Sequence, residues 1–355
     1  MEPSVTDRTA ANAPKVSVVA TTYNQEAYVR QTLDSFVAQE TDFPVEIIVA
    51  DDASTDATPA IIGEYADRHP DLFRPIFRSE NLGLNANLID ALSSARGEHL
   101  ALCEGDDYWV DPRKLSKQVT FLDEHPEVSV CFHPVRVIWE DGRIDDSEFP
   151  PVAWRRDLSV DKLLRRNFIQ TNSVMYRRLP NYGDIPADVM PLDWYLHVRH
   201  AVHGGIAMLP ETMAVYRRHP HGMWYDLVVD PPKFWVAHGL GHAATFDAML
   251  DLFPDDLMRE QIVAEQVDFM LRQVAKVPGL EGRAALLETV TQHPRIAMLA
   301  LQTRYSTPWQ RLKATWYTHG ADSLSRRALV DSYSQLIERL RREARRRVQP
   351  HADPH

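Results

Sequence analysis

The chain has 355 residues, a formal net charge of −11 and two cysteines, Cys103 and Cys131. This length suffices for one large domain with an extension, or for two domains. The negative charge gives no sign of a nucleic-acid-binding protein. Two cysteines without a CxxC partner argue against a disulfide framework or a zinc site. Without an apolar run of about 18 residues or an apolar signal core, the sequence predicts a soluble, cytoplasmic protein.

The first third of the chain alternates between continuous apolar runs and amphipathic stretches. We predict strands at residues 15–20, 45–50, 73–77 and 99–103. Helices are predicted between them, at residues 27–39, 58–69 and 84–95. Continuous apolar strands separated by helices indicate a parallel sheet that is covered on both faces.

The pattern is less regular after residue 107. Predicted helices occupy residues 112–124, 159–166 and 192–202, and predicted strands occupy residues 128–139, 171–176, 206–209 and 212–216. A boundary is expected near Asp230-Pro231-Pro232. Beyond it, helices are predicted at residues 234–252, 255–277, 281–292 and 323–348. The sequence therefore predicts an α/β domain with an α-helical C-terminal extension.

Polar side chains follow each of the first four predicted strands. They are Thr22 and Asn24, then Asp51 and Asp52, then Asn81, and finally Glu104, Asp106 and Asp107. The carboxyl ends of the strands are where open α/β sheets bind their ligands. Ser54 and Asp56 are equally well explained as caps of the following helix.

The run Glu104-Gly105-Asp106-Asp107 sets three carboxylates within four positions, directly after an apolar strand. Three such groups repel one another and need compensating positive charge, which a divalent cation carrying a diphosphate would supply. An isolated run of this kind is typical of a solvated turn. The polar residues after the neighbouring strands favour a ligand site instead.

Residues 15–224 resemble a family 2 glycosyltransferase with the GT-A fold, a Rossmann-like, mostly parallel central sheet flanked by helices. The matching segments are Val18–Asn24, Ile47–Asp56, Asn81-Leu82-Gly83, Glu104–Trp109 and Asp111–Leu115. The resemblance implies a GT-A domain at residues 15–229, with a nucleotide-binding half at 15–110 and an acceptor half at 111–229. A helical extension at 230–348 follows, and residues 1–14 and 349–355 are expected to be disordered.

The resemblance implies an inverting glycosyltransferase that uses Mg²⁺ or Mn²⁺ and a nucleotide-diphosphate sugar, either a UDP- or a dTDP-sugar. It places the donor nucleotide against Thr22, Tyr23, Asn24, Asp52, Asn81 and Asn87. It assigns metal binding to Asp107 and Asp106, with Asp106 also facing the ribose. Glu104 stands where the family more commonly has Asp, so the division of roles among the three acids stays open.

The resemblance also implies a catalytic base at the start of a helix, in an Asp followed by an aromatic residue. Asp193 in Pro191-Leu192-Asp193-Trp194-Tyr195 fits, although an Asp there is also typical of a helix N-cap, and Asp184 and Asp188 are competitors. In the segment Tyr216–Trp224, His219 is assigned to the metal or the phosphates. Arg217 or Arg218 is assigned to the phosphate charge.

Two alternative functions are a sugar nucleotidyltransferase and a non-catalytic nucleotide-sugar-binding protein. A sugar nucleotidyltransferase usually has a Gly-rich basic loop after the first strand, where this chain has Thr21–Glu26. A non-catalytic nucleotide-sugar-binding protein would lack the base. The resemblance implies an acceptor that is a sugar, a lipid-linked sugar or a small molecule, in bacterial polysaccharide, glycolipid or natural-product glycosylation, and leaves the choice among them open.

The C-terminal helices suit packing or a homo-oligomer. The last of them carries a cluster of arginines, which is more typical of a solvated helix end than of a peripheral membrane contact. These are Arg339, Arg341, Arg342, Arg345, Arg346 and Arg347.

Overall fold

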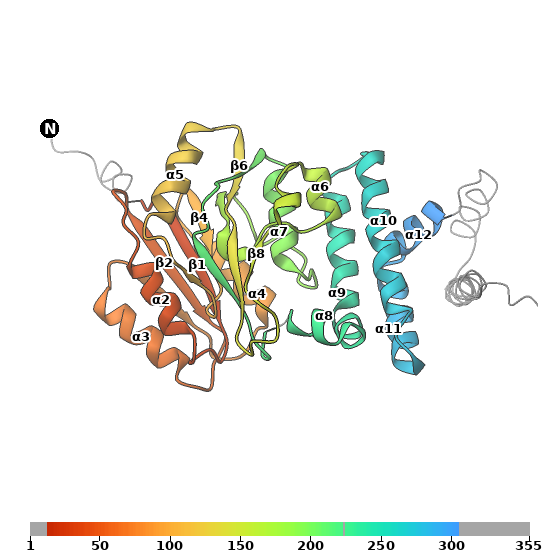
Figure 1. Cartoon of the computed structure of the whole chain (residues 1–355), viewed down its shortest axis with the longest axis horizontal. Coiled ribbons are helices and arrows are strands. Elements are labelled where there is room, and N and C mark those ends of the chain that lie inside the picture. Colours follow the sequence, from red (N-terminus) through yellow and green to blue (C-terminus); the bar gives the residue numbers. More distant parts are fainter. Residues whose placement is uncertain (1–12, 223, 305–355) are drawn as a thin grey trace, which may run out of the picture. The chain divides into compact units, whose positions relative to one another are not determined.

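The computed structural model describes residues 13–222 and 224–304 of the chain (Figure 1). These residues belong to two compact units, unit 1 (Met1–Gly222) and unit 2 (Met223–His355). The division falls a few residues before the boundary predicted at residue 230. The predicted helix at 323–348, its arginines and the C-terminal tail lie outside the described residues, as do residues 1–12.

Unit 1 is built on a seven-stranded sheet with the order β10-β6-β9-β4-β1-β2-β3. The strands are β1 (Val16–Thr22), β2 (Val45–Asp51), β3 (Phe73–Phe77), β4 (His99–Leu102), β6 (Val128–Phe132), β9 (Met175–Arg177) and β10 (Gly205–Met208). β1 pairs in parallel with β2 and β4, β2 with β3, and β6 with β10. Only β9, between β4 and β6, is antiparallel to its neighbours. The predicted α/β class with a mostly parallel sheet is confirmed.

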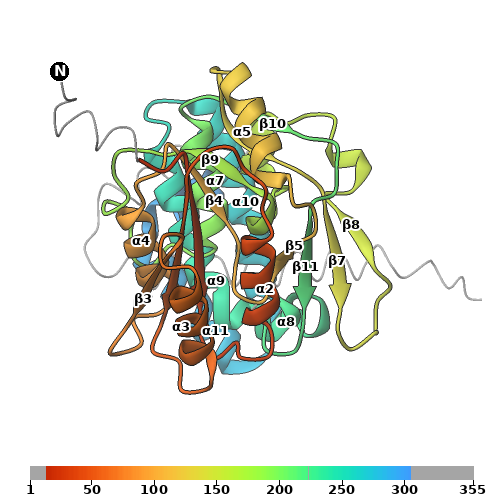
Figure 2. The same cartoon turned by 90° about the vertical axis from the view of Figure 1, so that its left-hand side faces the viewer.

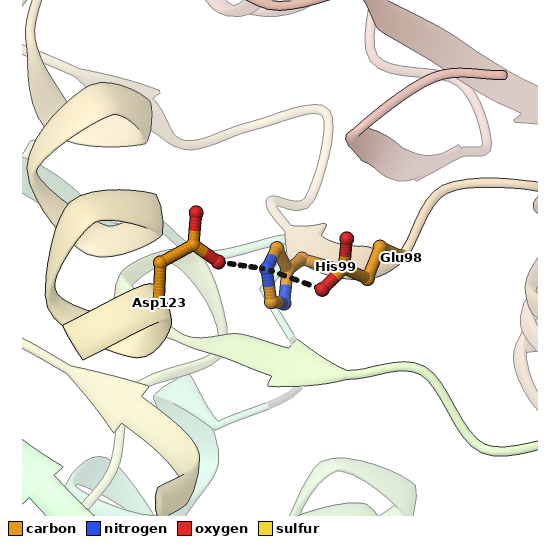
Figure 3. A group of neighbouring side chains, drawn as sticks. All are labelled: Glu98, His99 and Asp123. Atoms are coloured by element: carbon orange, nitrogen blue, oxygen red, sulfur yellow. Dashed lines mark ion pairs between the residues drawn. The ribbon is translucent and has the colours of Figure 1, made fainter. Parts of the chain in front are cut away.

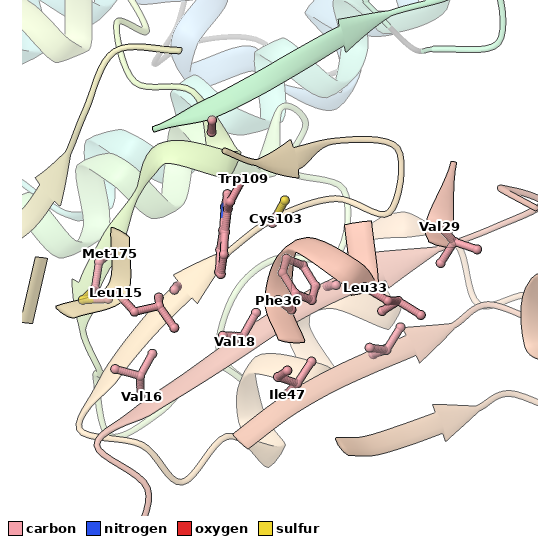
Figure 4. Packing of buried hydrophobic residues seen from close by; sticks show 14 of the residues in the cluster. Val16, Val18, Val29, Leu33, Phe36, Ile47, Cys103, Trp109, Leu115 and Met175 are labelled. Carbon is pink, nitrogen blue, oxygen red and sulfur yellow. The ribbon is translucent and has the colours of Figure 1, made fainter. Parts of the chain in front are cut away.

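Helices cover both faces of this sheet, and Figure 2 shows strands lying between α4 and α2. The helices of unit 1 are α2 (Val29–Val37), α3 (Thr58–Arg68), α4 (Leu84–Ser94), α5 (Lys114–Glu124), α6 (Val160–Arg165) and α7 (Leu192–Ala201), with 3₁₀ turns η1 (Val152–Trp154) and η2 (Thr171–Ser173). Alternate side chains of β1, such as Val16 and Val18, pack in one cluster with Leu33, Phe36 and Leu115 from the helices (Figure 4). Side chains alternate between the two faces of a strand, so the intervening residues of β1 face the other way.

A small second sheet has the order β5-β11-β7-β8. Its strands are β5 (Tyr108–Trp109), β7 (Val135–Trp139), β8 (Ser147–Phe149) and β11 (Ala214–Arg218). The single strand predicted at 128–139 is wrong, because the chain leaves one sheet after β6 and enters the other as β7. Pro134 lies at this break, where its missing N–H would interrupt a ladder of hydrogen bonds. The small sheet matters because β5 directly follows the acidic run and β11 directly precedes His219.

The described part of unit 2 is helical, in agreement with the predicted C-terminal extension. Its helices are α8 (Tyr225–Val229), α9 (Pro231–Asp251), α10 (Leu257–Val274), α11 (Gly279–Gln292) and α12 (Pro294–Arg304). α9 begins at the predicted boundary, where the Asp230 side chain accepts a hydrogen bond from the Lys233 N–H and Pro231 occupies the first turn. Among the described residues, every helix is too short or too polar to cross a membrane.

Candidate functional site

The acidic run leaves β4 beside the carboxyl end of β1. The N–H of Cys103 donates to the Val19 carbonyl at 3.2 Å, and the N–H of Gly105 donates to the Thr21 carbonyl at 3.1 Å. A Cβ on Gly105 would lie 2.3 Å from Gln25 Oε1 and 2.5 Å from Thr22 Cγ2, so a larger residue would force these two side chains to move. The turn brings oxygens of Glu104, Asp106 and Asp107 within 4.8 Å of one another.

Asp107 is fully buried, but only one of its two carboxylate oxygens has a hydrogen-bond partner. Its Oδ1 accepts a hydrogen bond from the Arg217 N–H at 2.8 Å, while its Oδ2 has no partner. Burial, followed by the charges of Asp106 and Glu104, raises the pKa of Asp107 well above its ordinary value. Burial, followed by the charges of Asp106 and Asp193, raises the pKa of Glu104 to about 8. A buried carboxylate oxygen without a partner is rare in proteins, and a bound cation would give it one.

His219, which the resemblance assigns to the metal or the phosphates, lies against this cluster. Its Nε2 is 3.1 Å from Asp106 Oδ2, its ring packs 4.7 Å from the ring of Tyr28, and its Nδ1 has no partner. Carboxylate oxygens are the ligands that Mg²⁺ prefers, and an imidazole is compatible with Mn²⁺. The donor set therefore fits either of the two predicted ions.

The two arginines of β11 are both engaged within the protein. The Arg217 guanidinium lies 4.7 Å from the centre of the Tyr28 ring and donates to Gln31 Oε1 at 2.8 Å. Its Nη1 lies 3.3 Å from Glu140 Oε1. The guanidinium of Arg218 lies 5.1 Å from the centre of the Trp139 ring. The backbone N–H of Arg217, rather than its side chain, is thus the group that contacts the acidic run.

Asp52 supports the loop that carries Asn81. Its two carboxylate oxygens accept the N–H groups of Leu82 at 2.8 Å and Gly83 at 2.9 Å. Gly83 has a φ of +84°, which favours glycine, and its N–H also donates to Asn81 Oδ1 at 3.0 Å. Asn81 itself is exposed. Each carboxylate oxygen of Asp52 has a second lone pair, so Asp52 still has acceptor capacity.

The segment after β1 lies next to the segment after β2. Thr22 is buried and donates to Asp51 Oδ1 at 2.9 Å. Asn24 has a φ of +51°, and its Oδ1 accepts the N–H of Thr55 at 2.8 Å. The side chain of Tyr23, which is 49% exposed, presents an aromatic surface beside them.

Asn87 does not lie where the resemblance placed it. It is buried, its Nδ2 donates to the Ala50 carbonyl at 2.8 Å, and its Oδ1 accepts from Arg78 Nε at 3.0 Å. The amide therefore joins α4 to β2 through Ala50 and to the segment after β3 through Arg78. Because it is buried, Asn87 supports the site from within the protein instead of lining its surface.

Asp193 occupies the second position of α7, and Pro191 is the N-cap residue. The Asp193 Oδ2 accepts from Asn167 Nδ2 and from Thr171 Oγ1, each at 3.3 Å. Burial raises the pKa of Asp193, and hydrogen bonds from the start of α7 and from Thr171 oppose this. Because its charge also raises the pKa of Glu104, Asp193 lies within electrostatic reach of the acidic run. The competitors Asp184 and Asp188 are both exposed.

The structure adds three residues that sequence reasoning missed. The Thr32 hydroxyl lies 2.8 Å from the Gly105 carbonyl oxygen and 2.6 Å from that of Asp107, which fixes the acidic turn. Behind Asp193, His197 Nε2 lies 4.0 Å from its Oδ2, and His197 Nδ1 is hydrogen-bonded to the Tyr176 hydroxyl. The i,i+4 spacing of Asp193 and His197 was the available signal.

Comparison with known proteins places these features in a family. A family model described as Glycosyl transferase family 2 matches residues 17–221. An uncharacterised protein of Mycobacterium tuberculosis (strain ATCC 25618 / H37Rv), Rv1520, is 66% identical over 299 residues, which cover 84% of this chain and 86% of that protein. The putative glycosyltransferase EpsE of Bacillus subtilis is 39% identical over 174 residues, which cover 49% of this chain and 62% of EpsE.

Two solved structures resemble the chain over most of its length. TarS residues 1–349 of S. aureus, in complex with UDP-GlcNAc, has a TM-score of 0.62 at 21% identity and covers 93% of this chain and 92% of its own. The mannosyltransferase PcManGT of Pyrobaculum calidifontis, in complex with GDP-Man and Mn²⁺, has a TM-score of 0.54 at 20% identity and covers 92% of this chain and 84% of its own. At these identities the likeness concerns the fold. The chain belongs to glycosyltransferase family 2 and has the GT-A fold.

Proposed function

We propose that the chain is an inverting, divalent-metal-dependent glycosyltransferase that moves a sugar from a nucleotide-diphosphate donor to an acceptor hydroxyl. Membership in the family supports the reaction class. The observation that carries the finer proposal is the buried Asp107 Oδ2, which has no partner within a cluster of three carboxylates.

The metal ligands in this proposal are Asp107, Asp106 and His219. Bound there, Mg²⁺ or Mn²⁺ would neutralise the charge that develops on the leaving nucleoside diphosphate. The backbone N–H of Arg217 holds one oxygen of Asp107 in place and leaves the other for the ion. The Mn²⁺ in the complex of PcManGT is consistent with such a role.

The donor nucleotide in this proposal lies along the carboxyl ends of β1 and β2. The ring of Tyr23 stacks on the base, and Asp52 accepts a hydrogen bond with its remaining lone pairs. Thr22, Asn24 and Asn81 shape the surrounding surface, and Asn87 is no longer included because it is buried. The UDP-GlcNAc in the complex of TarS favours a UDP-sugar as the first donor to test.

Asp193 is the proposed catalytic base. In an inverting transfer the base takes the proton of the acceptor hydroxyl. At the same time the oxygen of that hydroxyl bonds to the anomeric carbon, and the bond from this carbon to the diphosphate breaks. Burial raises the pKa of Asp193, which makes it a stronger base than an exposed aspartate. Its electrostatic contact with Glu104 supports a position close to the reacting sugar.

The first experiment is a thermal-shift screen of UDP-, GDP- and dTDP-sugars with and without Mn²⁺. At least one donor is expected to raise the unfolding temperature only when Mn²⁺ is present. A protein that no donor stabilises in a metal-dependent way would refute the donor site.

The second experiment compares Asp193→Asn with the matched control Asp184→Asn, using the accepted donor and a panel of acceptor sugars. Asp193→Asn should lower the rate of nucleoside diphosphate release by about 10³-fold or more, with the donor-induced thermal shift unchanged. Asp184→Asn should transfer normally. Wild-type turnover by Asp193→Asn would show that the base is misassigned. If the wild-type chain binds the nucleotide-sugar donor but transfers its sugar to no acceptor, a non-catalytic binding protein is favoured.

A further inference from the structure

A second cluster of candidate metal ligands lies at the opposite end of the central strands of the large sheet from the acidic run, where β4 begins. It consists of Glu98, His99 and Asp123, whose ligand atoms lie within 4.8 Å of one another (Figure 3). His99 is the first residue of β4, and Asp123 is in the last turn of α5. The acidic run follows the other end of β4, so the two clusters are separated by the length of a strand.

His99 is the feature that points to a missing ligand. Its side chain is 0% exposed, and neither ring nitrogen has a hydrogen-bond partner. Its Nε2 faces Glu98 Oε1 and Asp123 Oδ1, each at 3.7 Å, which is too long for a hydrogen bond. A cation between the three groups would give the imidazole a partner.

The spacing of the three ligand atoms suits zinc. With bonds of about 2.0–2.1 Å in tetrahedral geometry, neighbouring ligand atoms lie about 3.4 Å apart. The two separations of 3.7 Å from His99 Nε2 differ from this by only a few tenths of an ångström. One imidazole and two carboxylates form a mixed nitrogen and oxygen set, which suits Zn²⁺ better than Mg²⁺ or Ca²⁺.

The cluster already attracts positive charge. Lys15 Nζ lies 2.8 Å from Glu98 Oε2 and 2.9 Å from Asp123 Oδ1. The ammonium therefore satisfies the two carboxylates but leaves His99 without a partner. Lys15 is partly exposed on a flexible four-carbon stem, so its ammonium can move into solvent at little cost.

We propose that Glu98, His99 and Asp123 form a zinc site in which Zn²⁺ displaces the ammonium of Lys15. Three protein ligands leave a fourth position for water. The bound ion joins the start of β4 to the end of α5 and so stabilises unit 1. The proposal concerns the amino edge of the sheet and is independent of the donor site and its chemistry.

The test uses the full chain carrying Asp106→Asn and Asp107→Asn, which remove two carboxylates of the other cluster. After treatment with a chelator and its removal, Zn²⁺ is titrated into this protein by calorimetry. We expect one equivalent to bind, and both His99→Gln and Asp123→Asn to weaken binding at least about tenfold. Lys15→Met should strengthen binding by about tenfold, because the competing ammonium is removed.

Unfolding temperatures in the presence of chelator establish that each variant is folded. Asp123 is exposed, so Asp123→Asn is expected to fold. If His99→Gln does not fold, zinc binding by Asp123→Asn tests the proposal. Zinc should raise the unfolding temperature of the parent protein and not that of the ligand variants. The proposal is overturned if the chain carrying Lys15→Met takes up no zinc, or if zinc uptake does not depend on His99 and Asp123.

Discussion

Two carboxylates of unit 1, Glu46 and Asp107, are equally hidden from solvent but have opposite surroundings. Glu46 is 3% exposed and Asp107 is 0% exposed. Glu46 accepts the Ser17 hydroxyl at 2.6 Å and the Arg96 N–H at 2.7 Å, and it pairs with Arg74 at 2.6 Å. Asp107 accepts one backbone N–H, and its second oxygen has no partner.

The pKa shifts of these two groups follow from their partners. Burial acts to raise the pKa of Glu46, but hydrogen bonds from Ser17, Arg96 and Arg74 outweigh it, and the pKa is lowered. At Asp107 burial acts together with the charges of Asp106 and Glu104, and the pKa is raised. Glu46, which has a structural role, thus has its hydrogen bonds within the protein. Asp107, which we assign to an ion, has one oxygen without a hydrogen bond.

The sharpest test of this difference is Asp107→Asn. The amide oxygen can still accept the Arg217 N–H, but the charge for the metal is gone. We expect the rate of sugar transfer to fall by about 10³-fold or more, and the Mn²⁺-dependent thermal shift by the donor to disappear. The unfolding temperature of the metal-free protein should stay the same or rise, because repulsion with Asp106 is relieved. Turnover close to wild type would exclude Asp107 as the metal ligand.

The converse test is Glu46→Ala, which should damage stability rather than binding. It leaves Ser17 and two arginines without their shared acceptor. The free energy of unfolding, measured by urea denaturation, should fall by about 3 kcal/mol. Below the unfolding temperature, donor affinity should be unchanged. The exposed Glu80 offers a matched control, since Glu80→Ala removes the same charge from the surface. A loss as small as that of the control would show that the network around Glu46 is not structural.

Glu104 of the acidic run and Glu46 also differ in the direction in which their contributions to stability change with pH. The pKa of Glu104 is raised from 4.5 to about 8, so the folded state holds this proton more tightly than the unfolded chain does. In the metal-free protein this contribution to stability is present below pH 4.5 and is lost as the pH rises towards 8. The pKa of Glu46 is lowered, so its contribution is present above its unfolded value and is lost as the pH falls through its folded pKa.

A measurement of unfolding temperature against pH, with and without Mn²⁺, checks this prediction. The stabilisation by Mn²⁺ should grow from pH 5 to pH 8, as the carboxylates ionise. Glu104→Gln should flatten that rise, and the acid limb assigned to Glu46 should remain. A Mn²⁺ effect that is constant over this range would contradict the raised pKa of Glu104.

The edge of the sheet to which we assign the donor site was predictable because it depends on local patterns. An apolar run predicted a strand at 45–50 and a short strand was predicted at 73–77, and β2 and β3 occupy Val45–Asp51 and Phe73–Phe77. Parallel strands end at one edge, so the polar residues after them had to lie together.

Features that depend on contacts between distant segments were not predictable in this way. The N–H of Arg217 reaches Asp107 across 110 residues, and Asn85 is hydrogen-bonded to the Val189 carbonyl across 104. The buried position of Asn87 was not visible in the sequence, because its partner Ala50 in β2 lies 37 residues away along the chain. The two-residue strand β5 is too short to show any periodicity, and it forms because β11 lies beside it.

The smallest expected effect concerns Asp184, an exposed carboxylate with a good partner. Its Oδ1 accepts from Arg199 Nη2 at 2.8 Å, and the same nitrogen donates to the Asn181 carbonyl at 3.1 Å. Because solvent screens the pair and Asn181 still holds the arginine, Asp184→Asn should cost no more than about 0.5 kcal/mol in thermal or urea unfolding. Transfer should be unchanged. If transfer is lost instead, the base lies in the loop before α7, and the hydrogen bonds that hold the partly buried Asp193 serve the structure, as those of Glu46 do.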